Sequence, residues 1–334
     1  MSTKQQKSSG TKINIQVRAF FRSYPAMPYI VRWLCLSSII GVCIGSASAG
    51  FLQSLDWVTS YRENHLWLIT MLPFGGLAIG LLYYYLGKDI EPGNNAIFPA
   101  FASAIIADLV TKLWNTHHTH YHINLVPDIS VLHIIYAIIA GISFGICAAS
   151  FSKIIHFTNS IFKSKITFPP LRPLVGGIII ALAVWAIGTT KYIGVGIPTI
   201  VASFDQQLPP YDFAVKMAFT VITLAAGFKG GEVTSLFFIG AALGNALSYF
   251  IPLPTGLLAG MGFVAVFAGA TNTPLACMVM AMELFGSECG VYIAIACVVA
   301  YLFSGHNSIY GKQLVGEPKH SRFTNYQGKK INEL

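Results

Sequence analysis

The stretch Gly227-Phe228-Lys229-Gly230-Gly231-Glu232-Val233-Thr234-Ser235-Leu236-Phe237 interrupts one apolar run and begins another. Its glycine pair predicts a flexible turn that opens onto a short helix, whose first backbone N–H groups have no partner within the helix. Such a helix N-terminus carries partial positive charge and can bind an anion without a full cation in the membrane. A plain loop leading into a capped helix is the alternative interpretation.

Glu232 makes the plain loop less satisfactory, because an acidic side chain within an apolar region is costly and points to a functional site. The alternative is that Glu232 caps the helix and balances the charge of Lys229. Whether the surrounding apolar runs lie in a membrane depends on the composition of the whole chain.

The chain is too apolar for a water-soluble globule. Of its 334 residues, 54% are hydrophobic and 10% are charged, against a usual charged share of about 25% in soluble domains. Mean hydropathy is +0.62, and the glycines and prolines lie inside apolar stretches, as they often do in membrane helices. We expect an all-α, polytopic membrane protein.

The net charge of +8 lies mostly at the two ends of the chain. Basic ends that flank apolar segments fit the positive-inside rule, so we expect cytoplasmic termini and no nucleic-acid surface. No cleavable signal peptide is expected. The basic residues concerned are Lys4, Lys7, Lys12, Arg18, Arg22 and Arg32 before or at the start of the first span, and Lys312, Lys319, Arg322, Lys329 and Lys330 after the last.

Apolar segments of about membrane-spanning length occupy the first half of the chain. They are residues 33–55, 66–86, 96–114, 131–157 and 174–190. Beyond residue 211 the apolar runs shorten and are interrupted by glycine, proline and asparagine. Broken or re-entrant helices survive at membrane depth only where they line a cavity or are buried in protein, so this half predicts transport.

Three further segments have a similar character. Residues 91–95 form a Glu-Pro-Gly-Asn-Asn turn whose amides can donate hydrogen bonds to a small anion. Residues 269–275 break one apolar run, and Glu283 follows on the next. Residues 305–310 end the final run at Tyr310, whose hydroxyl could donate to an anion or lie in an interfacial aromatic belt.

Together these four segments resemble the CLC family of chloride channels and anion–proton antiporters. The resemblance covers nearly all of residues 30–315, and the Gly-Phe-Lys-Gly-Gly-Glu-Val-Thr and Gly-Asn-Asn wording is similar to the fluoride-exporting branch. It implies an inverted-repeat fold in which the amides of Glu232 and Val233 coordinate the central anion. The implied anion pathway comprises Gly93, Asn94, Asn95, Gly230, Gly231, Glu232, Val233, Thr234 and Tyr310.

Two departures from the family pattern stand out. Ser235 replaces a proline, which should loosen the helix start. The Gly-Lys/Arg-Glu-Gly-Pro element, which carries the gating glutamate in the family, is absent, and Asn95 runs directly into Ala96-Ile97-Phe98-Pro99. We therefore expect an internal deletion after Asn95, which removes part of the first repeat.

The expected organisation has three parts. A basic cytoplasmic segment covers residues 1–28, a transmembrane domain covers 29–311, and a cytoplasmic tail covers 312–334. Within the domain, the truncated first repeat is residues 29–157 and the second repeat is residues 168–311.

Histidines and cysteines offer little sign of a cofactor. His117, His118, His120 and His122 could hold zinc, but a solvated loop is the preferred interpretation and no cofactor or metal is expected. We expect the cysteines to be small buried thiols. Because no nucleophile elbow or Walker-type loop occurs, an enzyme is not expected.

The leading hypothesis is transport of fluoride, or of chloride, across a bacterial inner membrane, with or without proton exchange. The alternatives are a transport-inactive membrane protein that retains only packing and dimer surfaces, and a small-solute carrier of unrelated fold. The resemblance also implies a parallel homodimer, formed through helices 134–157 and 274–301.

Overall fold

The computed structural model describes residues 27–64, 121–228, 230–311, 313–316, 319 and 326–331, with single positions at 74, 77, 78, 81, 106 and 110. Several predictions fall outside these residues. They concern the Gly93-Asn94-Asn95 turn, the junction after Asn95, the side chain of Lys229, most of the two spans at 66–86 and 96–114, and three of the four clustered histidines.

Contacts divide the chain into two units. The first comprises residues 1–66 and 89–119, and its described helix is α2, Met27–Asn64, which contains the predicted span 33–55. The second comprises residues 67–88 and 120–334 and contains every other described helix. The site described below lies wholly within this second unit.

The described part of the chain is helical apart from one antiparallel bridge between Leu314 and Lys330, which confirms the all-α class. α5, Val131–Lys165, is the described helix that is long and apolar enough to cross a membrane. The helices that follow are shorter, as the broken pattern predicted. They are α6 Leu171–Ile187, α7 Ile197–Asp205, α8 Asp212–Ala225, α9 Glu232–Leu247, α10 Thr255–Thr271, α11 Pro274–Phe285 and α12 Gly290–Phe303.

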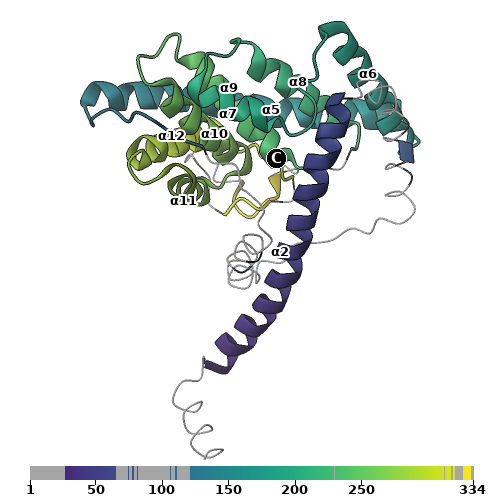
Figure 1. Cartoon of the computed structure of the whole chain (residues 1–334), viewed down its shortest axis with the longest axis horizontal. Helices are drawn as coiled ribbons and strands as arrows, with labels where there is room; N and C mark the ends of the chain where they lie inside the picture. Colours follow the sequence, from purple (N-terminus) through teal and green to yellow (C-terminus); the bar gives the residue numbers. More distant parts are fainter. Residues whose placement is uncertain are drawn as a thin grey trace, which may run out of the picture. The chain divides into compact units, whose positions relative to one another are not determined.

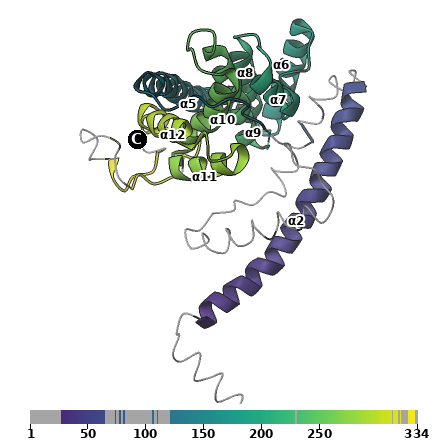
Figure 2. The same cartoon turned by 60° about the vertical axis from the view of Figure 1, so that its left-hand side comes forward.

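α10 forms the centre of the second unit. It packs against α5, α7, α9, α11 and α12 (Figures 1 and 2). Nearly all of its side chains are buried. α9 and α10 approach at backbone distance, because a Cβ atom placed on Gly240 would lie 2.0 Å from the carbonyl oxygen of Gly262. A Cβ on Gly244 would lie 2.0 Å from the carbonyl oxygen of Leu258. Small residues four apart allow this close packing between membrane helices.

α5 packs against α12 in a similar way. A Cβ on Gly145 would lie 2.8 Å from the carbonyl oxygen of Ala300, and one on Gly141 would lie 2.9 Å from the Cβ of Val299. Gly141 and Gly145, which lie in the segment that the resemblance implies for a dimer, therefore face α12 within the same chain. Any partner of α5 must use its outward, larger side chains.

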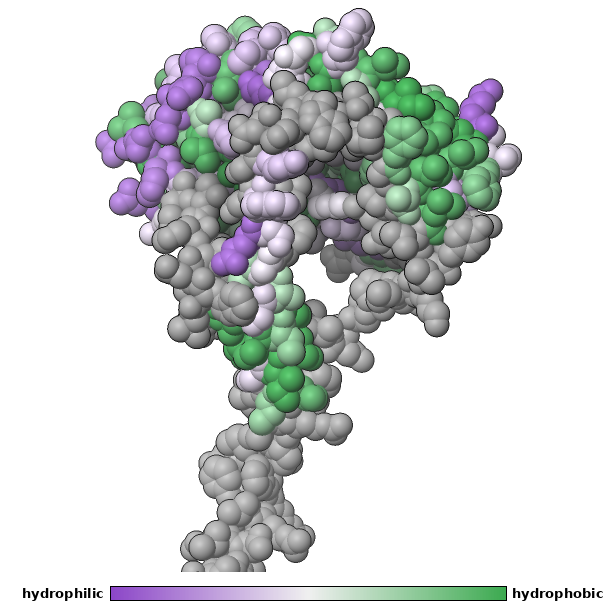
Figure 3. All heavy atoms as spheres, turned by 45° about the vertical axis from the view of Figure 1, so that its right-hand side comes forward, coloured by the Kyte–Doolittle hydropathy of each residue, from purple (hydrophilic) through white to green (hydrophobic). Residues whose placement is uncertain are grey.

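Large apolar side chains point outward over much of the second unit. Trp185 of α6 is 83% exposed and Phe250, just after α9, is 84% exposed. Figure 3 shows hydrophobic residues in broad patches on one face, with hydrophilic residues gathered toward its edges. Exposed apolar patches of this extent mark a surface that meets lipid or another protein.

Candidate functional site

The turn between α8 and α9 has the form predicted from its glycines. α8 ends at Ala225, and Gly227 takes a left-handed conformation with φ of 92°, which favours glycine. The chain is extended at Gly231, with φ of −73° and ψ of 104°, and α9 then begins at Glu232. α9 is continuous to Leu247, so Ser235 does not disrupt its first turns.

No described neighbour requires glycine at positions 230 and 231. Among the described residues, a Cβ added at either position would meet no atom within 4 Å, and Gly231 has a negative φ of −73°. Gly231 is the N-cap of α9 and makes no side-chain cap hydrogen bond. The described neighbours therefore leave space beside the turn, just before the first N–H groups of α9, which have no partner within the helix.

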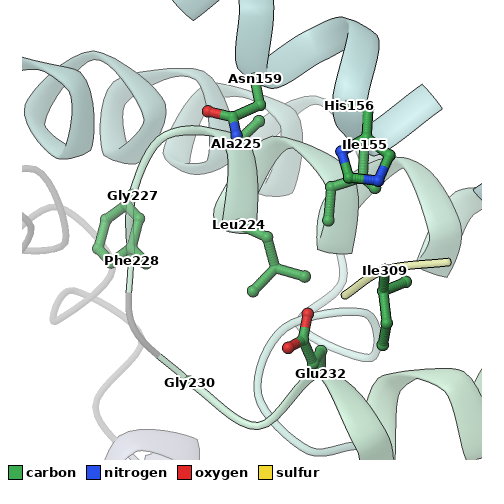
Figure 4. A pocket seen from close by; sticks show the side chains of 10 residues that line it. All are labelled: Ile155, His156, Asn159, Leu224, Ala225, Gly227, Phe228, Gly230, Glu232 and Ile309. Atoms are coloured by element: carbon green, nitrogen blue, oxygen red, sulfur yellow. The ribbon is translucent and has the colours of Figure 1, made fainter. Parts of the chain in front are cut away.

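A cavity of about 250 Å³ lies beside this turn. Its lining includes Ile155, His156 and Asn159 of α5, Leu224 of α8, and Ile309 of the segment after α12. Gly230 and Glu232 also line it, and the carboxylate of Glu232 points into the space (Figure 4).

The predicted residues occupy different places around this cavity. Gly231, Val233 and Thr234 are at the start of α9 but are not among the residues that line the space, and Val233 and Thr234 are half-buried. Tyr310 is also not part of the lining, although its neighbour Ile309 is. Tyr310 lies within electrostatic range of Glu232, so the structure brings these two motifs together.

Hydrogen bonds fix the segment after α12. The Ile309 amide donates to the carbonyl oxygen of Ala270 over 3.0 Å, and the Tyr310 amide donates to Oγ of the buried Ser308 over 3.1 Å. His156 Nε2 lies 2.8 Å from the Ser308 carbonyl oxygen, which joins this segment to α5.

The segment 269–275 lies at the end of α10 and takes part in a different contact. Asn272 ends α10 with a left-handed φ of 59° and donates from Nδ2 to the Asn307 carbonyl oxygen over 3.3 Å. Lys319 Nζ donates to Asn272 Oδ1 and to the Tyr301 carbonyl oxygen, each over 2.6 Å. Burial lowers the pKa of Lys319 to about 7. Glu283 is exposed on α11.

A buried charged cluster lies at the start of α8. Asp212 is fully buried, pairs with Lys191 and accepts a hydrogen bond of 2.7 Å from the Tyr192 hydroxyl. Lys216 Nζ donates to the carbonyl oxygens of Tyr192 and Gly194, over 3.1 and 2.7 Å. These contacts hold residues 191–194, which precede α7, against the start of α8.

His156 and Asn159 are site residues that the sequence analysis missed. They are polar side chains three apart in a long apolar helix, and that pattern alone marks them as candidates for a polar site.

The described residues contain no group of three His, Cys, Asp or Glu side chains suited to a metal. Cys147, Cys277, Cys289 and Cys297 are buried as expected, but Cys35 and Cys43 are exposed.

Comparison with known proteins gives a consistent family. The family model described as voltage gated chloride channel matches residues 90–305. A chloride/fluoride channel protein of Pseudomonas syringae pv. tomato is 38% identical over 403 aligned positions, which cover 89% of each chain. That alignment is longer than this chain, so the relative carries sequence that this chain lacks. An uncharacterised protein of Methanocaldococcus jannaschii is 25% identical and covers 81% of this chain and 70% of its own.

Two solved structures share the fold. The crystal structure of a CLC-type fluoride/proton antiporter superposes with a TM-score of 0.79 at 23% identity, over 84% of this chain and 97% of that one. A slow cyanobacterial Cl⁻/H⁺ antiporter superposes with a TM-score of 0.54 at 15% identity, over 76% of this chain and 60% of that one.

Proposed function

This chain belongs to the CLC family of voltage-gated chloride channels, integral membrane proteins that transport anions, and we propose that its own anion is fluoride. The observation that carries this proposal is the start of α9. Its first N–H groups have no partner within the helix, and they follow two glycines that no described neighbour requires. Fluoride is small and strongly hydrated, and it needs backbone donors that it can approach closely.

The proposed pathway uses the residues of the family motifs. The amides of Glu232 and Val233 bind the anion, with Gly230, Gly231 and Thr234 shaping the turn, and Tyr310 donates from the opposite segment. Gly93, Asn94 and Asn95 add amide donors from the first repeat. The relative from P. syringae is named for both chloride and fluoride, which supports this choice of anions.

The membrane placement is also a proposal. We place both termini in the cytoplasm of a bacterial cell, with a multi-pass domain over residues 29–311 in the inner membrane. A parallel homodimer would use the outward apolar side chains of α5, α11 and α12, since their small residues pack internally. Crosslinking in bilayers should give dimers, and monomers alone would contradict the assembly.

Flux from proteoliposomes tests the choice of anion. The full chain is reconstituted with internal fluoride or chloride, and efflux is followed with ion-selective electrodes against protein-free vesicles. We expect fluoride to leave faster than chloride. Faster chloride efflux would overturn the fluoride proposal, and no efflux of either anion from folded protein would establish the transport-inactive alternative.

That alternative has a specific basis, because the element with the gating glutamate is absent from the chain. Glu232 is then our candidate for the remaining pH dependence of flux. Its protonation removes a negative charge that faces the anion, so flux should rise as pH falls. Glu232→Gln should flatten the pH profile, and an unchanged profile would assign Glu232 a purely structural part.

A further inference from the structure

Two polar side chains of α5 face the anion pathway from the side opposite α9. His156 and Asn159 are three positions apart, so they share one face of the helix, and both line the cavity that contains Glu232 (Figure 4). Ile155 of α5 and Leu224 of α8 add apolar side chains to the lining. The polar groups therefore converge on one space from two helices.

A hydrogen bond fixes the tautomer of His156. Its Nε2 lies 2.8 Å from the Ser308 carbonyl oxygen, which can only accept, so Nε2 must carry hydrogen. Among the described residues Nδ1 has no hydrogen-bond partner, and it is the nitrogen that remains to take a proton. A proton at Nδ1 would make this imidazole a cationic group with a second N–H donor.

Three titratable side chains lie on the described elements next to this imidazole. Glu232 lines the same cavity from α9, Tyr310 lies in the segment after α12, and Lys153 is one turn earlier on α5. The second half of α8 and all of α10 and α12 contain no Asp, Glu, Lys or Arg. Lys229 belongs to the turn by sequence, but it lies outside the described residues.

We propose that His156 and Asn159 form an anion-binding station on the α5 side of the cavity, and that protonation of His156 at Nδ1 strengthens binding there. Asn159 supplies a neutral amide donor, and imidazolium supplies a charged one opposite Glu232. A proton gained at His156 and an anion held beside it are then thermodynamically linked. This inference rests on the proposed anion transport and identifies a second binding group in the same pathway.

Linkage gives a test that does not depend on flux. Full-length protein with ¹³C-labelled histidine in nanodiscs is titrated with acid, with and without sodium fluoride. Sodium gluconate at equal ionic strength controls for screening. We expect fluoride to move the His156 midpoint to higher pH, while His133 stays unchanged. His133 is the matched control, because it lies on α5, outside the cavity, with its Nδ1 2.8 Å from the Asp128 carbonyl oxygen.

The reciprocal effect is measured by fluoride titration calorimetry. Fluoride affinity should rise about tenfold between pH 8 and pH 5.5, which is a coupling of about 1.4 kcal/mol. His156→Gln should reduce the rise to the part that Glu232 contributes, whereas His133→Gln should keep the full rise. Asn159→Leu should weaken binding at both pH values and leave the rise intact. An equal shift with gluconate, or an unmoved His156 midpoint, would overturn the inference.

A second measurement covers the case in which His156→Gln fails to fold. Diethylpyrocarbonate modification of the parent protein, mapped by mass spectrometry, should be slowed by fluoride at His156 and not at His133. Equal protection of both would overturn the inference. A parent that binds fluoride in this way but shows no efflux would refute the proposed transport while supporting the station, so the two failures are distinguishable.

Discussion

The two ends of α9 use glycine for opposite purposes. At Gly240 and Gly244 an added Cβ would strike backbone atoms of α10 at 2.0 Å, whereas at Gly230 and Gly231 it would meet nothing within 4 Å. The first pair lets two helices touch, and the second leaves space among the described residues beside the turn that precedes α9. Glycines close together in sequence can therefore serve either close helix packing or an open turn. The neighbouring atoms show which of the two applies at each position.

Gly240→Ala should break the packing end and give the largest effect. Overpacking a core typically costs about 1–3 kcal/mol, and here the obstacle is backbone that no side-chain rotation can move, so we expect a larger loss. The measurement is the yield of monodisperse protein and its melting temperature in detergent. Gly290→Ala is the matched control, because its nearest neighbour, Met282, is 3.9 Å away. Equal stability of the two variants would refute the close approach.

Asn245 tests the same end through its polar contacts. It is fully buried, accepts from the Leu208 amide over 2.9 Å, and donates to the carbonyl oxygens of Ser203 and Gln206 over 2.8 and 2.7 Å. Asn245→Leu leaves these buried groups unpaired and should lower the free energy of unfolding by about 3 kcal/mol.

Thermal unfolding monitored by tryptophan fluorescence measures this loss. The exposed Gln207, which donates to Ser248 Oγ and Thr255 Oγ1, provides the comparison. Gln207→Ala should change stability by no more than about 0.5 kcal/mol. A loss of similar size in both variants would mean that the Asn245 bonds do not anchor α7 to α9.

Gly231→Ala tests the open end. Because a Cβ meets no neighbouring atom there, the fold should be unchanged. The methyl group would occupy the approach to the first amides of α9, so we expect fluoride flux to fall about tenfold, equivalent to about 1.4 kcal/mol. Gly316→Ala in the tail, also without close neighbours, should leave flux unchanged. Normal fluoride flux in Gly231→Ala would show that Gly231 is not part of the anion pathway.

Lys319 extends the comparison to the tail. Burial lowers its pKa from 10.5 to about 7, so between these values the undocked tail binds more protons than the docked one. The free energy of docking should therefore become more favourable as pH rises through this window. Below pH 7 the full free-energy penalty for burying the protonated amine remains. Hydrogen exchange of residues 301–316 should slow from pH 7 to 9 after correction for intrinsic rates, and Lys319→Met should remove that trend. A retained trend would assign it to another group.

The sequence predicted local features better than tertiary ones. The break at 227–231 and the helix beginning at Glu232 follow from the glycine pair and were confirmed. Residues 174–190 were expected to form one apolar segment, but α6 ends at Ile187 because Gly188 takes a left-handed φ of 73°. His156 approaches Ser308 across 152 positions, and no local pattern indicates such a contact. The contact of Gly141 and Gly145 with α12 is likewise tertiary, because sequence does not tell which neighbour a face of small residues meets.

Gly240 and Gly262 restrict how this protein can evolve. Each would strike the carbonyl oxygen of the other if it gained a Cβ, at 2.0 and 2.1 Å. Since no amino acid is smaller than glycine, a substitution at one position has no compensating substitution at the other. A double mutant should therefore recover none of the stability that each single mutant loses. We expect both positions to stay glycine while other positions of the domain vary.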